Sequence, residues 1–150
     1  MNTVHFDLTR ATSAVRMMVE TLGSSGVFNL AASKDTATHR VLVSVQHVLF
    51  GDHLGERGRG EFIPSGQDGL INIRDNMSEE TTMATFLHET MHLLQMMEGT
   101  LDELVSRGVN QTWAEREVEH DACNRALTLA ERNDWLGLLP RLRADCRALR

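Results

Sequence analysis

Residues 85–95 read Thr-Phe-Leu-His-Glu-Thr-Met-His-Leu-Leu-Gln, with two histidines four positions apart inside an otherwise apolar run. On a helix, residues four apart share one face, with their Cβ atoms roughly 5–6 Å apart. His88 and His92 could therefore bind one metal ion. Glu89, turned about 100° from His88, would not be a ligand but could exchange a proton with a metal-activated water. The alternative is a pair of structural histidines in a buried helix, and a third ligand decides between the two interpretations.

The flanking residues predict that this segment lies within a long helix. Asn76 and Ser78 are good N-cap residues, and Glu79 and Glu80 suit the positive end of a helix. Gly99 is well placed to end the helix, which would then have about five turns. The face that should pack into the core carries Leu87, Met91 and Leu94.

A second helix, predicted from about Thr112 to Arg132, carries the acidic residues that could supply the third ligand. Glu119 is preferred, because the small residues Ala122 and Ala126 follow it on the same face and would let the two helices approach closely. Catalytic zinc sites generally use three protein ligands and leave the fourth position to water. His88, His92 and Glu119 would make up such a set.

Neighbouring polar residues of the second helix have other expected roles. Glu115 is the alternative third ligand, although its position three residues after Thr112 fits a capping box at the start of the helix. Glu117 lies about 160° from Glu119 around the helix axis and should face solvent. His120 and Asp121 are expected to be outer partners of the ligands or surface residues.

The two segments together resemble a known class of enzyme. The pattern His88-Glu-Thr-Met-His-Leu-Leu-Gln95, followed by Arg116-Glu-Val-Glu-His-Asp-Ala122, resembles the zincin metallopeptidases, in the gluzincin branch whose third ligand is a glutamate. It is similar to small, poorly characterised bacterial and phage-associated metallopeptidases that carry His-Glu-x-x-His-x-x-Gln and then Glu-x-Asp-Ala. The 27-residue interval from His92 to Glu119 is also similar to that of the ImmA/IrrE family, although Cys123 stands here where that family often has Asn.

The resemblance implies a zinc-dependent peptidase with one Zn²⁺ per chain, held by His88, His92 and Glu119. Glu89 would be the general base that takes a proton from the activated water and returns it to the leaving amine. The predicted strand Leu70–Arg74 would be the sheet edge along which an extended polypeptide substrate lies.

Stabilisation of the oxyanion is the point at which the chain departs from many zincins, which use a tyrosine or histidine there. This chain has no tyrosine. The metal alone could serve, or one of the nearby cationic or imidazole side chains of Arg107, Arg116 and His120. The missing tyrosine favours the alternative of a non-catalytic zincin-like binding or structural module, whereas the presence of Glu89 favours catalysis. A small-molecule amidase is a third alternative.

The rest of the sequence predicts an α+β fold in a single domain over residues 1–150, and the resemblance implies that this domain is zincin-like. We expect a first helix from Asp7 to about Leu22, a strand over His39–Gln46, and a hairpin formed by Glu61–Pro64 and Leu70–Arg74. A small antiparallel sheet or hairpin would then pack on the histidine-bearing helix and the second ligand-bearing helix, followed by a helical C-terminus.

Composition and cysteine spacing narrow the expected partners, the cellular location and the state of the cysteines. The net charge of −6 argues against a nucleic-acid partner, which needs a basic surface. No signal peptide or membrane-spanning run is visible, so a cytoplasmic protein without a membrane partner is expected. Cys123 and Cys146 lack the spacing of a metal site, and we expect free thiols rather than a disulfide. The sequence carries no pattern that predicts an oligomeric state.

Overall fold

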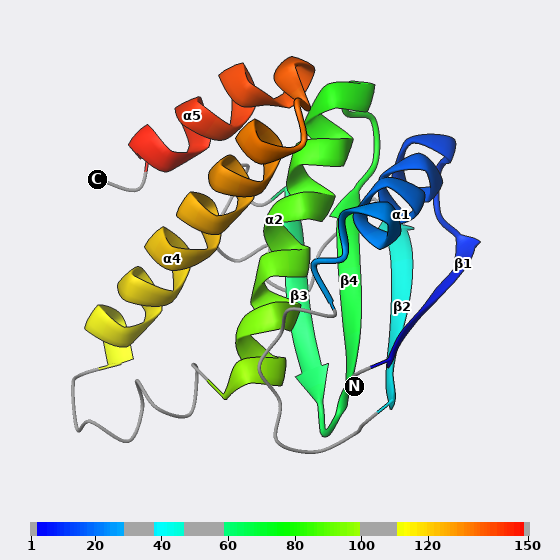
Figure 1. Ribbon diagram of the computed structural model, residues 1–150. Helices are drawn as coiled ribbons and strands as arrows, with labels where there is room; N and C mark the ends of the chain where they lie inside the picture. Colours follow the sequence, from blue (N-terminus) through cyan, green and yellow to red (C-terminus); the bar gives the residue numbers. More distant parts are fainter. Residues whose placement is uncertain (1–2, 29–37, 47–58, 100–110, 149–150) are drawn as a thin grey trace.

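The computed structural model describes residues 3–28, 38–46, 59–99 and 111–148, without the side chains of residues 24, 25 and 111–116. It has an α+β fold, in which a four-stranded sheet is covered on one side by helices (Figure 1). In chain order the elements are β1 Thr3–Arg10, α1 Ser13–Ser25, β2 Thr38–Gln46, β3 Gly60–Ser65, β4 Asp68–Arg74, α2 Glu79–Glu98, α4 Gln111–Arg132, the short 3₁₀ helix η2 Leu136–Leu138 and α5 Leu139–Ala148.

The sheet is mixed and has the strand order β1-β2-β4-β3. β1 pairs with β2 and β2 with β4 in parallel, whereas β3 and β4 form the predicted antiparallel hairpin. The hairpin and the strand at His39–Gln46 are therefore confirmed, but the expectation of an antiparallel sheet is not. The prediction that Leu70–Arg74 is the sheet edge is wrong, because β2 pairs with β4 on the side away from β3. β3 is the edge strand next to α2.

The N-terminal segment contains a strand that the sequence interpretation missed. Residues Asp7–Arg10 belong to β1, and α1 begins only at Ser13, where the Thr12 hydroxyl accepts a hydrogen bond from the Val15 amide at 3.4 Å. Val4, Phe6 and Leu8 alternate with exposed residues along β1 and pack on the core. This period of two is the signal of a strand with one buried face.

α2 is the central helix of the fold, and its predicted limits are confirmed. The Ser78 hydroxyl caps the start by accepting from the Thr81 amide at 3.1 Å, and Gly99 ends the helix with a φ of +76°. α2 contacts β3 and β4 on one side and α1, α4, α5 and η2 on others. Leu87, Met91 and Leu94 are buried, as predicted.

The second predicted helix is also present, and α5 packs on it. Ala122, Ala126 and Ala130 of α4 are fully buried, so small side chains do line its contact with the core. The expectation of free thiols is wrong, because Cys123 of α4 and Cys146 of α5 form a disulfide, with Cα atoms 5.6 Å apart. The two cysteines lie 23 positions apart in the sequence, and their proximity depends on how α5 folds back onto α4.

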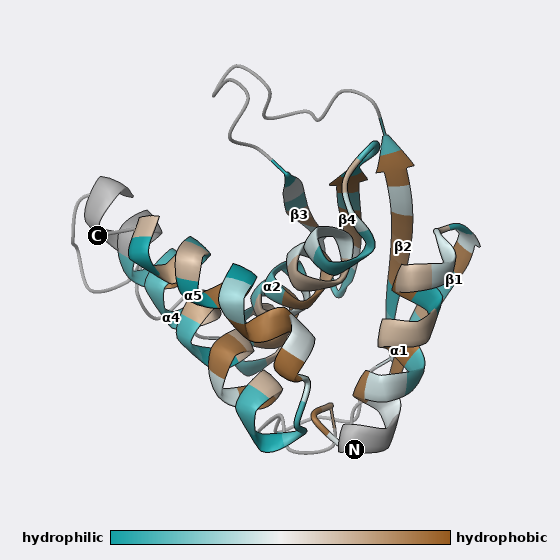
Figure 2. Cartoon of the chain, turned by 90° about the horizontal axis from the view of Figure 1, so that it is seen from above, coloured by the Kyte–Doolittle hydropathy of each residue, from teal (hydrophilic) through white to brown (hydrophobic). Residues whose placement is uncertain are grey.

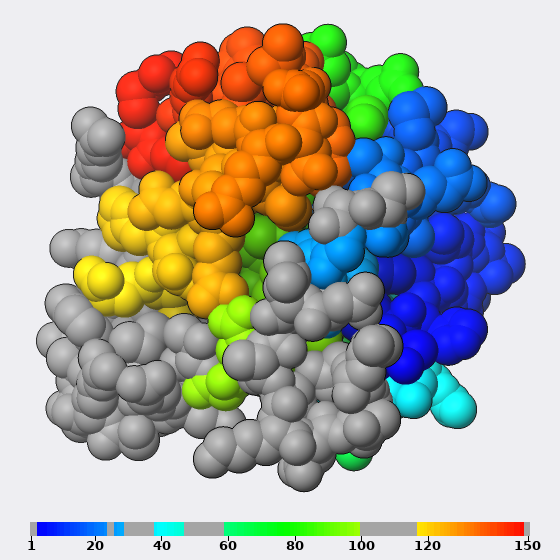
Figure 3. Space-filling view, viewed as in Figure 1, coloured from blue at the N-terminus to red at the C-terminus, as the bar shows by residue number. Residues whose placement is uncertain are grey.

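A single apolar cluster fills the space between the sheet and the helices. Figure 2 shows hydrophobic segments along β2 and β4, the two central strands of the sheet. In the space-filling view, α4 and α1 lie on either side of α2, of which only small patches reach this surface (Figure 3). Within the described ranges, no helix combines the length and the apolar character that crossing a membrane would require.

Candidate metal centre

His88 and His92 lie one turn apart on the same face of α2. Their rings meet edge to face with centroids 5.0 Å apart. Both are largely shielded, since 16% of the His88 side chain and 10% of the His92 side chain are exposed. The helix therefore presents two imidazoles side by side, in the arrangement that their spacing predicted.

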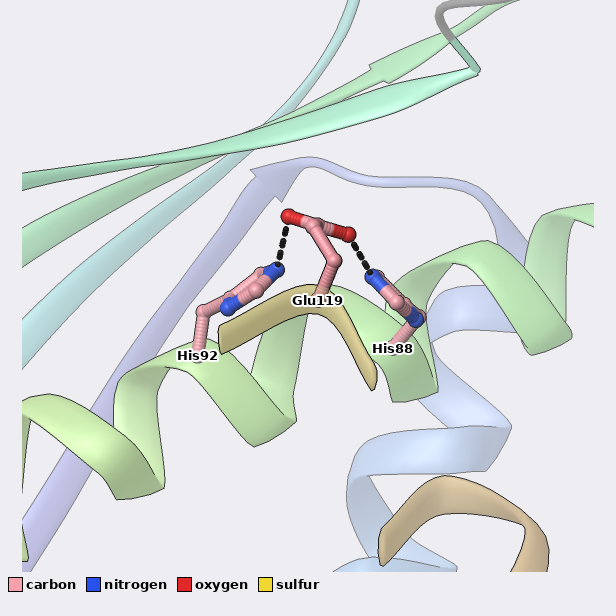
Figure 4. A group of neighbouring side chains, drawn as sticks. All are labelled: His88, His92 and Glu119. Carbon is pink, nitrogen blue, oxygen red and sulfur yellow. Dashed lines mark hydrogen bonds and ion pairs between the residues drawn. The ribbon is translucent and has the colours of Figure 1, made fainter. Parts of the chain in front are cut away.

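Glu119 of α4 reaches between the two imidazoles (Figure 4). Its Oε2 lies 2.9 Å from Nε2 of His88, and its Oε1 lies 2.9 Å from Nε2 of His92. One ligand atom from each of the three residues can be chosen so that all three atoms lie within 4.8 Å of one another. The fold thus brings together the three residues that the sequence proposed as ligands, although His88 and Glu119 lie 31 positions apart in the chain.

The short contacts change the protonation of the cluster in the metal-free protein. Burial alone would lower the pKa of His92, but the hydrogen bond with Glu119 and the negative charges of Glu89 and Glu119 raise it to about 9. Burial likewise opposes ionisation of Glu119, yet its hydrogen bonds with His88 and His92 hold its pKa well below the usual range. At neutral pH the metal-free cluster therefore contains an imidazolium beside a carboxylate.

Glu89 follows His88 on α2 and lies close to the charged groups of the cluster. It is buried, and this burial raises its pKa, while the nearby charges of His88 and His92 partly oppose the rise. The first residue of β3 packs directly against it, because a Cβ added to Gly60 would lie 3.2 Å from Glu89 Cγ. Glu89 is thus a carboxyl group with raised basicity, between α2 and the edge strand.

The ligand set fits a zinc ion. Two imidazole nitrogens and a carboxylate oxygen are ligands that zinc accepts, and around a tetrahedral ion they would be roughly 3.3–3.6 Å apart. The observed separations range from 2.9 Å up to the 4.8 Å limit, so shifts of about 1 Å would suffice. The side chain of Glu119 is 43% exposed, so the cluster is open to solvent on that side.

The other candidate residues fall into three groups. Glu117 is exposed, as predicted, and Asp121 accepts a hydrogen bond from Gln95, which in turn contacts His92. His120 is partly exposed, and the hydrogen bonds of the cluster among the described residues do not include its ring. The predictions for Glu115 and Arg116 concern side chains outside the described part, and Arg107 lies in a range that is not described.

Gln95 is a residue of the site that the sequence interpretation did not assign. It is fully buried and contacts both His92 and the second helix. Its place three residues after His92 on one helix was the available signal, because residues at that spacing are neighbours. Its partners on α4 are distant in sequence.

Comparisons with known proteins were made at three levels. Neither protein-family models, nor curated proteins, nor solved structures gave a match to this chain.

Proposed function

We propose that the protein is a zinc-dependent peptidase of the gluzincin type. The observation that carries the proposal is the convergence of His88, His92 and Glu119, together with a buried glutamate, Glu89, directly after the first histidine. Structural histidines in a buried helix need one partner each, whereas here both share one carboxylate that remains partly open to solvent. Two imidazoles and an accessible carboxylate that meet in this way match the His₂Glu ligand set of catalytic zinc sites.

His88, His92 and Glu119 would hold the metal. When bound, zinc would supply a Lewis acid that polarises a carbonyl and lowers the pKa of a water to about 7. Glu89 is the group that moves the proton. Its raised pKa makes the carboxylate a better base for accepting a proton from water, and the acid so formed can donate that proton to the leaving amine.

The edge strand β3 is the feature that favours a polypeptide as the substrate. β3 pairs with β4 on one side, and Gly60 at its start packs against Glu89. An extended peptide that paired with the other side of β3 would bring its backbone close to that carboxyl group. This role belongs to β3 rather than to Leu70–Arg74.

The test compares wild-type protein with Glu89→Gln. Glutamine keeps the shape of glutamate but cannot accept a proton from water, so the variant should retain zinc and its fold while losing cleavage of a peptide library by about 10²-fold or more. Glu117→Gln, the same change at an exposed position of α4, is the matched control and should cleave like wild type.

Two outcomes would contradict the peptidase. Equal residual cleavage by wild type and Glu89→Gln would assign the activity to another group or to a contaminant. A wild-type protein that binds zinc but cleaves nothing in the library would favour the non-catalytic binding module.

We propose a cytoplasmic location on the basis of the sequence alone. The Cys123–Cys146 disulfide is the observation that weighs against this location. Disulfides are rare in cytosolic proteins and common in oxidising compartments. Differential alkylation of Cys123 and Cys146 in freshly lysed cells decides the question. Reduced thiols would support the cytoplasm, and an intact bridge would support an oxidising compartment.

A further inference from the structure

Gln95 makes three hydrogen bonds from a position where its side chain is fully buried. Its Oε1 lies 2.8 Å from Nδ1 of His92. Its Nε2 donates to the backbone carbonyl of Val118 at 3.0 Å and to Oδ2 of Asp121 at 2.8 Å. One side chain of α2 therefore contacts a metal-ligand candidate on its own helix and two groups of α4.

The partners on α4 determine which way the Gln95 amide points. A backbone carbonyl and a carboxylate are both acceptors, so the NH₂ group must face Val118 and Asp121. The reverse orientation would place the amide oxygen against two other oxygens in a buried position, where unsatisfied polar atoms are costly. The oxygen of Gln95 therefore faces His92.

An oxygen at that position also determines which nitrogen of the His92 ring carries a hydrogen in the metal-binding form. The amide oxygen can only accept, so Nδ1 of His92 must carry the hydrogen that is donated to it. Nε2 is then the nitrogen left to bind a metal, and it is the atom that points toward Glu119. Gln95 thereby selects both the tautomer and the rotation of the ring.

The same amide group fixes the second helix. Val118 directly precedes Glu119 in the sequence, and Asp121 follows it by two positions, so the two bonds lie on either side of the third ligand. Asp121 is itself held by Nε of Arg125 at 2.9 Å, and Arg125 forms a second ion pair with Glu98 at 2.7 Å. The carboxylate that receives the Gln95 hydrogen is thus kept in place from outside.

We propose that Gln95 is the positioning residue of the metal centre, which orients His92 and sets the position of Glu119 through a single buried amide. The inference rests on the proposed metal site and adds to it a residue that contacts neither metal nor substrate. Outer partners of metal ligands typically change metal affinity by about 10–100-fold when they are removed. A residue that only joined two helices would change stability without this effect.

The experiment measures zinc affinity by competition with a chelator and records the imidazole NH signals of the zinc-loaded protein by NMR. Gln95→Met keeps a similar volume and removes all three hydrogen bonds. We expect zinc to bind about 10–100-fold more weakly to this variant, and the His92 Nδ1–H signal, protected from exchange in wild type, to be lost.

Thr90→Val is the matched control, since Thr90 is a fully buried polar residue of α2 whose hydroxyl donates to the Phe86 carbonyl at 2.8 Å, away from the ligands. It should bind zinc within about twofold of wild type. Asp121→Ala removes one of the two acceptors of the Gln95 amide from a side chain that is 41% exposed, and it provides a test if Gln95→Met folds poorly. We expect about a threefold to tenfold loss of zinc affinity in Asp121→Ala.

The outcomes separate this inference from the metal site itself. Wild-type zinc affinity in Gln95→Met together with a protected Nδ1–H signal, or unchanged affinity in Asp121→Ala, would overturn the inference and leave the metal centre standing. A wild-type protein that takes up no zinc would overturn both.

Discussion

Glu119 is the residue on which the proposed metal centre depends, because it is the one candidate ligand that comes from a second helix. Without a third ligand, His88 and His92 would remain a pair of imidazoles on a buried helix. The structure shows the carboxylate shared between them, with both of its oxygens used. This arrangement leads to a prediction that distinguishes Glu119 from its acidic neighbours.

Glu119→Ala should weaken zinc binding by more than about 100-fold, since it removes a ligand rather than an outer partner. Glu115→Ala should leave zinc affinity unchanged and cost about 1 kcal/mol of stability, because it removes the acid of the capping box that the sequence predicts near the start of α4. Chelator competition and urea unfolding measure the two effects.

Glu117→Ala, at an exposed position between these two residues, is the control and should change neither quantity appreciably. Loss of zinc from Glu115→Ala with retention in Glu119→Ala would move the third ligand one turn back along α4.

The sequence predicted some residues of the candidate metal site but not others. The convergence of His88 and His92 follows from helix geometry alone, and Glu119 follows from the face that it shares with Ala122. Gln95 could not be assigned in the same way, because one of its partners is the backbone carbonyl of Val118. A backbone group has the same chemistry at every position, so its partner depends on how two helices pack.

The approach of β3 to α2 is the contact between elements that brings the sheet edge to the site. A side chain at Gly60 would lie 2.5 Å from Thr85 Cγ2 as well as 3.2 Å from Glu89 Cγ. β3 and α2 can approach each other this closely because residue 60 has no side chain.

Gly60→Ala should destabilise the protein by about 1–3 kcal/mol through overpacking, and it should also lower cleavage activity, because β3 or Glu89 must move to relieve the contact. Gly23→Ala is the control. Gly23 lies in α1 with no atom within 4 Å of an added Cβ, and alanine there should be neutral or stabilising by up to about 1 kcal/mol. Equal unfolding free energies for Gly60→Ala and wild type in urea titrations would show that the contact is looser than described.

A disulfide and an ion pair join α5 to two different parts of the fold. The Cys123–Cys146 disulfide holds it to α4, and Asp145 forms an ion pair with Arg59. Arg59 directly precedes β3, and its carbonyl accepts a hydrogen bond from the Arg74 amide at 2.8 Å. α5 thus connects the helix that carries Glu119 with the start of the edge strand.

Reduction of the disulfide should lower the free energy of unfolding by about 3 kcal/mol, as expected for a closed loop of this length. Urea titrations with and without dithiothreitol measure the difference. The double variant Cys123→Ala, Cys146→Ala should not respond to the reductant. If wild-type protein unfolds at the same urea concentration in both conditions, the bridge contributes no stability.

The sequence predicted the helix ends well, because they depend on residues next to them in the chain. It predicted strand order and the disulfide less well, because these depend on contacts between distant segments. The limits of α2 follow from Ser78 and Gly99, which act on their own helix ends. β4 lies inside the sheet because it also pairs with β2. In the sequence, β3 stands between these two strands. The disulfide depends on how α5 folds back onto α4. Neither partner choice is contained in the spacing of residues along the chain.

In the fold as a whole, the candidate site lies on two helices that are packed against each other and against their neighbours. α2 is enclosed by the sheet, α1, α4 and α5, so the two histidines are on the most buried helix of the described chain. α4 is positioned against α2 by small residues, by Gln95 and, through α5, by the disulfide. Such preorganisation favours tight metal binding, since little ordering is left for the ion to impose.

Metal analysis of protein purified without chelators tests the central claim most directly. We predict close to one zinc per chain in wild-type protein, and almost none in the variant with both His88→Ala and His92→Ala. Wild-type protein that is isolated without zinc and also fails to take it up on addition, while remaining folded, would contradict the metal centre and the peptidase proposed from it.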